Sequence, residues 1–261
     1  CHSARCLMDP GPTTDDRPEA DDGADNLAIE VSGLSKAFGR TPVLRNLDLK
    51  VPWGEVLTIL GPNGSGKTTL IKVLATLTKP DIGRISVAGS DIARAGQTVR
   101  RNIGVVTHET LLYDDLTGYE NLKFVARMFM LDRIEERIES AVERMGVKAR
   151  LQQRIGTMSH GLKKRFSIAR ALLHDPLILM IDEPESGLDQ EAQALLEAVV
   201  SDRTNPFRTV LMTTHNLERG LAMGHRTAIL VHGKIAFHES VESMGRAAVR
   251  EAYNRHSGAA D

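Results

Sequence analysis

A glycine-rich loop that ends in a lysine and two threonines is the first group of residues that could do chemistry. Residues 61–68 read Gly-Pro-Asn-Gly-Ser-Gly-Lys-Thr and fit G-x-x-x-x-G-K-[ST] between a predicted strand and a predicted helix. Glycines let backbone N–H groups converge on phosphate oxygens, and the start of the following helix adds partial positive charge. Lys67 is expected to reach the β- and γ-phosphates and the Thr68 hydroxyl to bind Mg²⁺. The predicted nucleotide contacts are Gly61, Asn63, Gly64, Ser65, Gly66, Lys67, Thr68 and Thr69. The alternative is a glycine-rich turn before an ordinary helix. The bare pattern would arise by chance in roughly one in a hundred chains of this length.

Two carboxylates follow an apolar segment later in the chain. Residues 177–181 are apolar throughout and run directly into Asp182 and Glu183. A strand of a parallel sheet would carry both side chains to the carboxyl edge, where the phosphate loop is also expected. Asp182 is the predicted Mg²⁺ carboxylate, and Glu183 is the predicted general base, or at least the group that orients the attacking water.

His215 follows a further apolar run, residues 209–213, and is predicted to reach the same edge. A hydrogen bond from its imidazole to the γ-phosphate would stabilise charge in the transition state. A histidine at the end of a strand is otherwise usually structural. The catalytic interpretation therefore depends on the phosphate loop and the two carboxylates in the same chain.

The elements that position these residues are predicted from hydrophobic periodicity. Strands are expected at 28–31, 43–51, 55–60, 84–88, 103–107, 177–181, 209–213, 227–231 and 234–237. Helices are expected at 67–77, 162–173 and 190–201, with one more at the C-terminus, and residues 119–145 are expected to be mostly helical. Within the long helical segment Ile134, Ile138, Val142 and Met145 share one face, which should point to the core. Strands that alternate with helices predict an α/β fold with a largely parallel sheet covered on both faces.

Composition narrows the class of protein. The chain has 261 residues, 41% of them hydrophobic, enough for one α/β domain with a small subdomain. A net charge of -1 and 4% aromatic residues argue against nucleic acid as a partner. No run approaches the roughly 20 apolar residues of a membrane span, so a role at a membrane would need another chain.

The N-terminal segment is predicted to be a disordered acidic tail over residues 1–26. Its two cysteines, Cys1 and Cys6, form no disulfide framework, which suits a reducing cytosol. Met8 is the expected start of translation, and a lipid-modified Cys1 is the alternative.

Taken together, these residues resemble the ABC ATPase family over about residues 29–237. The family's signature loop, L-S-G-G-Q, is matched by Met-Ser-His-Gly-Leu at 158–162, which keeps Ser159 and Gly161 and departs at the other three positions. The resemblance implies a P-loop NTPase of the ABC type, with a mostly parallel sheet core, an antiparallel β subdomain and a helical subdomain at about 117–172. The ATP-binding domain would span 27–240, and residues 241–261 would form a C-terminal helix and tail.

The resemblance also implies how ATP is held. In this family the signature loop binds the γ-phosphate held by the other protomer, so a second ATP-binding subunit is required, here expected to be an identical copy. Residues 186–189 match the loop that couples the two sites, which includes Asp189. Phe38 falls where an aromatic ring stacks on adenine. The alternative for Phe38 is a half-buried residue at the end of a strand.

One departure from the family pattern concerns a glutamine that usually follows the strand at 103–107. It contacts Mg²⁺ or the lytic water and relays the state of ATP to the membrane partner. Glu109 takes its place here, as an expected contact to ATP and Mg²⁺, although His108 is an alternative equivalent. A glutamate adds negative charge beside the phosphates, which predicts slow turnover or altered coupling.

The cofactors implied are ATP and Mg²⁺, and the activity implied is ATP hydrolysis that powers a transporter. A membrane-spanning permease would hold this subunit at the cytoplasmic face of the membrane. Residues 108–117 are most similar to subunits of the haem exporter of cytochrome c maturation, although exporters of drugs, lipids or polysaccharides share much of the pattern, and an importer stays open. The rival from another class is a non-transport regulator, an ATP-gated clamp with little turnover.

Overall fold

The computed structural model describes residues 27–184, 188, 190–202, 205 and 207–258, so the predicted acidic tail lies outside the described part. The strands are β1 (Leu27–Phe38), β2 (Thr41–Pro52), β3 (Val56–Leu60), β4 (Ile82–Val87), β5 (Ser90–Asp91), β6 (Ile103–Val106), β7 (Ile178–Asp182), β8 (Thr209–Thr214), β9 (Arg226–Val231) and β10 (Lys234–Ser240). The α-helices are α1 (Lys67–Leu74), α2 (Gly96–Asn102), α3 (Gly118–Met128), α4 (Ile134–Arg144), α5 (His160–Leu172), α6 (Gln190–Val200), α7 (Leu217–Met223), α8 (Val241–Met244) and α9 (Arg246–Ser257). Two short 3₁₀ turns, Lys148–Arg150 and Ile155–Thr157, precede α5.

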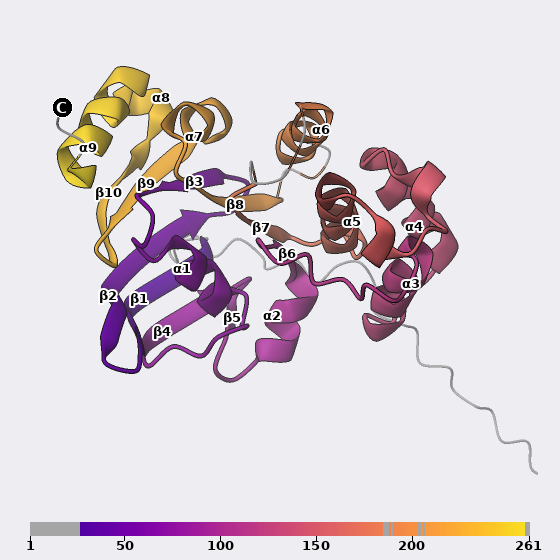
Figure 1. The fold of residues 1–261 in the computed structure, drawn as a ribbon. Helices are drawn as coiled ribbons and strands as arrows, with labels where there is room; N and C mark the ends of the chain where they lie inside the picture. The colour runs from indigo at the N-terminus through magenta and orange to yellow at the C-terminus, as the bar shows by residue number, and fades with distance from the viewer. Residues whose placement is uncertain (1–26, 185–187, 189, 203–204, 206, 259–261) are drawn as a thin grey trace, which may run out of the picture.

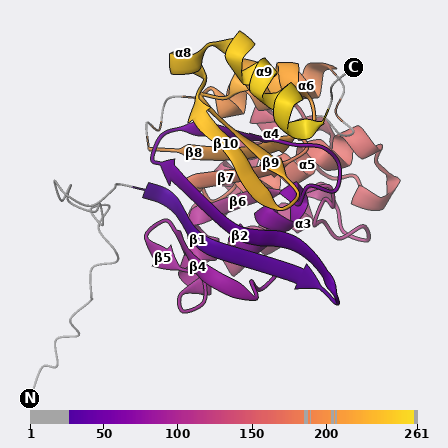
Figure 2. The same cartoon turned by 90° about the vertical axis from the view of Figure 1, so that its left-hand side faces the viewer.

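The strands form two sheets, and the larger one carries the predicted chemistry. Its order is β10-β9-β3-β8-β7-β6, with parallel pairing from β9 to β6 and β10 antiparallel at one edge. The smaller sheet, β2-β1-β4-β5, is antiparallel. Figure 1 shows it below the larger sheet, and Figure 2 shows β1 and β2 from the side. The mixed α/β architecture agrees with the fold class expected from the sequence.

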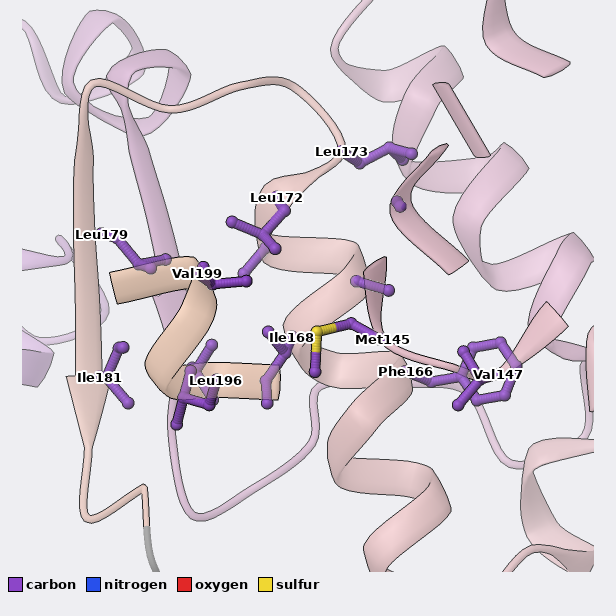
Figure 3. Packing of buried hydrophobic residues seen from close by; sticks show 14 of the residues in the cluster. Met145, Val147, Phe166, Ile168, Leu172, Leu173, Leu179, Ile181, Leu196 and Val199 are labelled. Carbon is purple, nitrogen blue, oxygen red and sulfur yellow. The ribbon is translucent and has the colours of Figure 1, made fainter. Parts of the chain in front are cut away.

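The larger sheet separates two hydrophobic layers because side chains alternate along its strands. On β7, Leu179 and Ile181 pack with the helices, whereas Ile178 and Met180 pack toward α1 and the smaller sheet. Figure 3 shows Leu179 and Ile181 facing side chains of α5 and α6. Each fully buried aliphatic side chain of this kind stabilises the fold by about 1.5–3 kcal/mol. The sheet is therefore fixed from both sides, which holds its carboxyl edge in place.

The mostly helical segment expected at 119–145 is confirmed, and it consists of two helices, α3 and α4. Residues 129–133 form a turn, in which Met130 and Arg133 have φ of 54° and 43°. The turn lets α4 fold back on α3 (Figure 1), and apolar residues across it hid the break from the periodicity. The predicted core stripe is confirmed: Ile138, Val142 and Met145 are buried and Ile134 packs against them.

Short elements were missed or misjudged in length. Helices α2 and α7 have seven residues each, too few to show a helical period, and neither was predicted. Strand β1 continues to Phe38, well beyond the predicted 28–31, through several register shifts that disturb a simple alternation. Among the described residues, no helix is both long and apolar enough to cross a membrane.

Candidate nucleotide site

The phosphate loop joins β3 to α1 and is packed closely against β9. A Cβ on Gly61 would lie 2.3 Å from the carbonyl oxygen of Leu230, so only glycine fits there. Gly66 precedes α1 with φ of 109°, a backbone conformation that strongly favours glycine. Lys67 is buried, and its Nζ donates to the carbonyl oxygens of Gly61 at 2.9 Å and Pro62 at 3.1 Å. The lysine is thus held inside the loop that precedes it.

Ser65 gives a direct test of whether this loop fits a phosphate. Its hydroxyl is buried and has no hydrogen-bond partner among the described residues. Its backbone is held in place, because Ser65 N donates to Pro62 O and Gly233 N donates to Ser65 O at 3.1 Å. A buried hydroxyl without a partner is costly, and a phosphate oxygen in the loop would satisfy it. Asn63, Gly64 and Thr68 are exposed at the mouth of the loop, and Thr69 is half-buried.

The two carboxylates lie at the end of β7, as expected from the sequence. Asp182 is buried and accepts a hydrogen bond of 2.6 Å from the Thr213 hydroxyl on β8. Glu183 N donates to Thr213 O at 3.1 Å, and Glu183 has φ of 46°. A left-handed conformation at a non-glycine residue costs about 1–3 kcal/mol. That strained turn ends β7 and carries the glutamate side chain toward Lys67 and His215.

Glu183 connects the phosphate loop to His215. Its Oε1 lies 3.5 Å from Lys67 Nζ and 3.6 Å from His215 Nδ1. His215 follows β8 and is about half exposed, whereas Lys67 is buried. Three residues from three separate parts of the chain therefore converge, and they are the predicted phosphate-binding lysine, general base and transition-state histidine.

The segment after β6 leaves the same edge of the sheet, beside Asp182. Strand β6 pairs with β7 so that Val106 lies opposite Ile181. Glu109 Oε1 then lies 3.9 Å from Lys72 Nζ on α1. The ring centroids of His108 and His160 are 6.5 Å apart, so His108 faces the signature loop. Of the two alternatives for the family glutamine, Glu109 is the one directed to the phosphate-loop helix.

The signature loop lies at the start of α5. Ser159 caps this helix, with its hydroxyl accepting from Leu162 N at 3.4 Å, and Gly161 lies in the first turn. A helix N-terminus capped in this way is suited to anions. Phe38 ends β1 and has 54% of its surface exposed, with Lys36 Nζ 5.4 Å from the ring centroid. Its ring is accessible for stacking, while Asp189 lies outside the described residues.

Comparison with known proteins agrees with this geometry. Residues 44–186, more than half of the chain, match the family described as ABC transporter. The chain belongs to the ABC transporter ATP-binding family. ABC ATPases bind ATP with Mg²⁺ and hydrolyse it, so this chain is an ATP-binding ATPase subunit of an ABC transporter.

Relatives include proteins named for export and for drug resistance. The chain is 35% identical over 210 residues to the Nod factor export ATP-binding protein I of Rhizobium sp. (strain N33), covering 80% of this chain and 69% of the relative. It is 36% identical over 212 residues to the daunorubicin resistance ATP-binding protein DrrA3 of Streptomyces coeruleorubidus, covering 80% and 67%.

Solved structures of the family share the fold. An ATP-binding subunit of an ABC transporter superimposes with a TM-score of 0.80 at 28% identity, covering 87% of this chain and 98% of that one. A dimeric ATP-binding cassette in a post-hydrolysis state, with ADP and Pi bound, gives a TM-score of 0.72 at 24% identity and covers 82% and 98%. At that identity the second likeness supports the fold.

The ABC subunit has oxygen ligands for Mg²⁺ but no complete cage in its described part. No group of three or more His, Cys, Asp or Glu side chains there could hold a metal ion by itself. The Thr68 hydroxyl and the buried Asp182 are hard oxygen ligands, of the type that Mg²⁺ prefers, and Mg²⁺ usually completes its shell with substrate phosphates and water. The residues present therefore fit a metal that arrives with its nucleotide.

Sequence reasoning missed the residues that hold the Glu109 segment in place. Lys164 on α5 is fully buried, and its Nζ donates to Thr107 O at 2.8 Å. The Thr107 hydroxyl donates to Glu109 O at 2.7 Å. In the sequence, Lys163-Lys164-Arg165 reads as one basic stretch, but the three side chains have different surroundings. Lys163 pairs with Asp114 at 2.9 Å and Arg165 with Glu191 at 3.1 Å, whereas Lys164 points into the core. The available signal was helical spacing, because Lys164 shares a face with the buried Ile168.

Proposed function

We propose that this chain powers an exporter, working as a pair of ATP-binding subunits on a membrane-spanning permease at the cytoplasmic face of the membrane. The observation that carries the catalytic part is the convergence of Lys67, Glu183 and His215 within 3.6 Å contacts at one sheet edge. The direction of transport is supported by the relatives, which are named for Nod factor export and daunorubicin resistance.

Hydrolysis follows from the placement of these side chains. Lys67 and the loop N–H groups hold the β- and γ-phosphates. Thr68 and Asp182 would hold Mg²⁺, which would neutralise charge on the phosphate oxygens. Glu183 accepts a proton as water oxygen bonds to the γ-phosphorus and the bond to the β–γ bridging oxygen breaks. His215, next to Glu183, donates to the γ-phosphate and stabilises its charge. ADP and phosphate leave, and the proton on Glu183 returns to solvent.

The second subunit is proposed because, in this family, the signature loop of one protomer binds the γ-phosphate held by the other. Ser159 and Gly161 lie at the start of α5, and they would reach the γ-phosphate held by the other protomer. The capped helix end supplies donors that suit an anion. A homodimer is the simplest such pair, and the structurally similar cassette with ADP and Pi is described as dimeric.

The membrane partner is proposed to contact the helical region, defined here as residues 111–172, which includes α3, α4 and α5. Leu111, Tyr113, Phe124, Met128 and Met130 are large apolar side chains that are 41–74% exposed. The rings of Tyr113 and Phe124 pack edge to face at 5.5 Å, so at least two of them form a common surface. This surface begins two residues after Glu109, and closing the ATP site would move residues 117–172 with it.

The exported compound depends on the permease. Haem export for cytochrome c maturation is the narrower hypothesis, and its support is the likeness of residues 108–117 to subunits of that exporter. Another exporter, of a drug, lipid or polysaccharide, is the alternative, and it is consistent with relatives named for Nod factor export and daunorubicin resistance. An ATP-gated clamp on a soluble complex is the alternative from another class.

The experiment is to trap the ATP-bound state with Glu183→Gln, purify it from detergent-solubilised membranes and identify co-purifying proteins by mass spectrometry. Glu183→Gln should abolish hydrolysis, strengthen ATP-dependent dimers and retain a multi-span membrane protein. Glu197→Gln, an exposed change of the same kind on α6, is the matched control and should hydrolyse ATP normally. Recovery of a soluble complex without a membrane protein would contradict the transport proposal. Unchanged turnover in Glu183→Gln would contradict the catalytic assignment.

A further inference from the structure

Three carboxylates lie at or just after the ends of neighbouring strands, β6 and β7, at the sheet edge where the phosphate loop also lies. Asp182 and Glu183 end β7, and the β6–β7 register brings the segment that carries Glu109 beside them. The Asp182 carboxylate is committed to Thr213 and to the proposed metal. Glu109 therefore adds a further negative charge to an edge that must also accept a triphosphate. Without a nearby cation this charge would oppose ATP binding.

Two lysines of the same helix face these carboxylates. Lys67 Nζ lies 3.5 Å from Glu183 Oε1, and Lys72 Nζ lies 3.9 Å from Glu109 Oε1. Side chains on a helix lean toward its N-terminus, so Lys72 extends back along α1 toward the phosphate loop. Lys67 is already required by the phosphates, which leaves Lys72 as the cation placed to compensate Glu109.

The backbone that carries Glu109 is fixed, so its side chain is the part that can respond to charge. Thr107 is buried, its carbonyl accepts from the buried Lys164, and its hydroxyl donates to the Glu109 carbonyl at 2.7 Å. The Glu109 side chain itself is 73% exposed. Because the backbone is fixed and the side chain is exposed, the position of the Glu109 carboxylate depends on the charges around it, of which Lys72 is one.

We propose that Lys72 is a positioning residue for ATP binding, which compensates the charge of Glu109 and so makes an acidic side chain at this place compatible with Mg·ATP. The inference rests on the nucleotide site proposed above and deepens it. Because the pair is largely exposed, it adds little to the stability of the fold. The pair acts instead on the affinity for Mg·ATP. Removing the compensating charge of Lys72 should weaken Mg·ATP binding about 3- to 10-fold.

The test is a double-mutant cycle on the full chain. Mg·ATP affinity is measured by calorimetry for the wild type, Lys72→Met, Glu109→Gln and the double variant, each at low and high salt. Lys79→Met, an exposed lysine a few residues beyond α1, removes the same charge and is the matched control. Circular dichroism melting checks that each variant is folded.

Lys72→Met should weaken Mg·ATP binding about 3- to 10-fold when Glu109 is present, and less than about 2-fold when residue 109 is Gln. The loss should shrink at high ionic strength, while Lys79→Met leaves the affinity unchanged. An equal loss in both backgrounds, or no loss in either, would overturn the inference. Failure of the wild type to bind Mg·ATP, or full binding by Lys67→Ala, would instead overturn the nucleotide site on which it rests.

Discussion

Gly61 sets how closely the phosphate loop can approach β9. The ideal Cβ position at Gly61 lies 2.3 Å from Leu230 O and 2.8 Å from Ser65 Oγ. The nearer atom belongs to the backbone of β9, which is paired on both sides, and cannot move without disturbing the sheet. The loop therefore keeps its shape through close packing at residue 61 as much as through its own hydrogen bonds.

Gly61→Ala should lower the free energy of unfolding by about 1–3 kcal/mol, because a methyl group is forced into a filled space. It should also weaken ATP binding, since the displaced loop no longer directs its N–H groups at one point. Thermal unfolding and calorimetric titration with Mg·ATP measure the two effects. Gly96→Ala is the matched control, because its Cβ would meet only the Arg100 guanidinium at 3.4 Å and its backbone is helical. A stable Gly61→Ala protein with unchanged affinity would show that the packing at this position is unimportant.

The sequence predicted the residues of the candidate site that have local signals, and it missed those defined by the fold. Lys67 has the loop pattern, and Glu183 and His215 each follow an apolar strand, so their meeting at one edge could be expected. Thr107 and Lys164 have no such pattern, because their contacts join β6 to a helix 57 residues away in sequence. Helical spacing places Lys164 on the face of Ile168, but the packing of α5 is needed to show that its Nζ donates to Thr107 O.

At the scale of elements, long strands and helices have local sequence signals, whereas the junctions between them are defined by the tertiary fold. The central strands of the larger sheet, such as β3 and β7, were predicted because they are buried on both faces and read as apolar runs. The break between α3 and α4 was not, since its cause is the tertiary packing of one helix on the other. The turn that follows α5 is a further junction of this kind. There the His174 ring stacks on Phe129 from the end of α3, with centroids 4.3 Å apart, and Nε2 donates to Ile103 O at 3.0 Å.

Burial lowers the pKa of His174 below its ordinary value of 6.5, helped by the charge of Arg170 and, more weakly, Arg137, while the Ile103 carbonyl and Asp175 act in the opposite direction. The unfolded chain therefore takes up a proton below pH 6.5 before folded His174 does. This contribution to stability is fully present above pH 6.5 and is lost as pH falls toward the lower folded-state pKa. His238 acts in the same sense, since burial and Arg226 lower its pKa as well.

His174→Gln should therefore reduce the fall in melting temperature between neutral and mildly acidic pH, while Gln retains a donor for Ile103. Melting curves at several pH values, for wild type and variant, measure this slope. His232→Gln, an exposed histidine in the β9–β10 turn, serves as the control and should leave the slope unchanged. A slope that is the same in His174→Gln and wild type would mean that His174 titrates normally in the folded protein.

At the scale of the whole molecule, the helical region and the C-terminal helices lie at opposite ends of the larger sheet. Figure 1 shows α3 and α4 at one end and α8 and α9 at the other. Both ends expose a methionine, Met128 at the end of α3 with 65% of its surface exposed and Met244 at the end of α8 with 44%. The proposed permease surface includes Met128 and excludes Met244. Introducing a charge at each position therefore distinguishes a specific contact from nonspecific hydrophobic association.

Met128→Glu in the Glu183→Gln background should reduce recovery of the membrane partner about 5- to 10-fold, because a carboxylate at an apolar contact must be desolvated without a partner. Met244→Glu should leave recovery unchanged. Quantitative mass spectrometry of the purified complexes gives the ratio of membrane protein to ATP-binding subunit, and Mg·ATP binding by each isolated subunit shows that it is folded. Equal recovery from Met128→Glu and Met244→Glu would move the permease contact away from the helical region. Closure of the ATP site would then have to act on the permease through a different surface, because the residues that follow Glu109 would not contact the membrane partner.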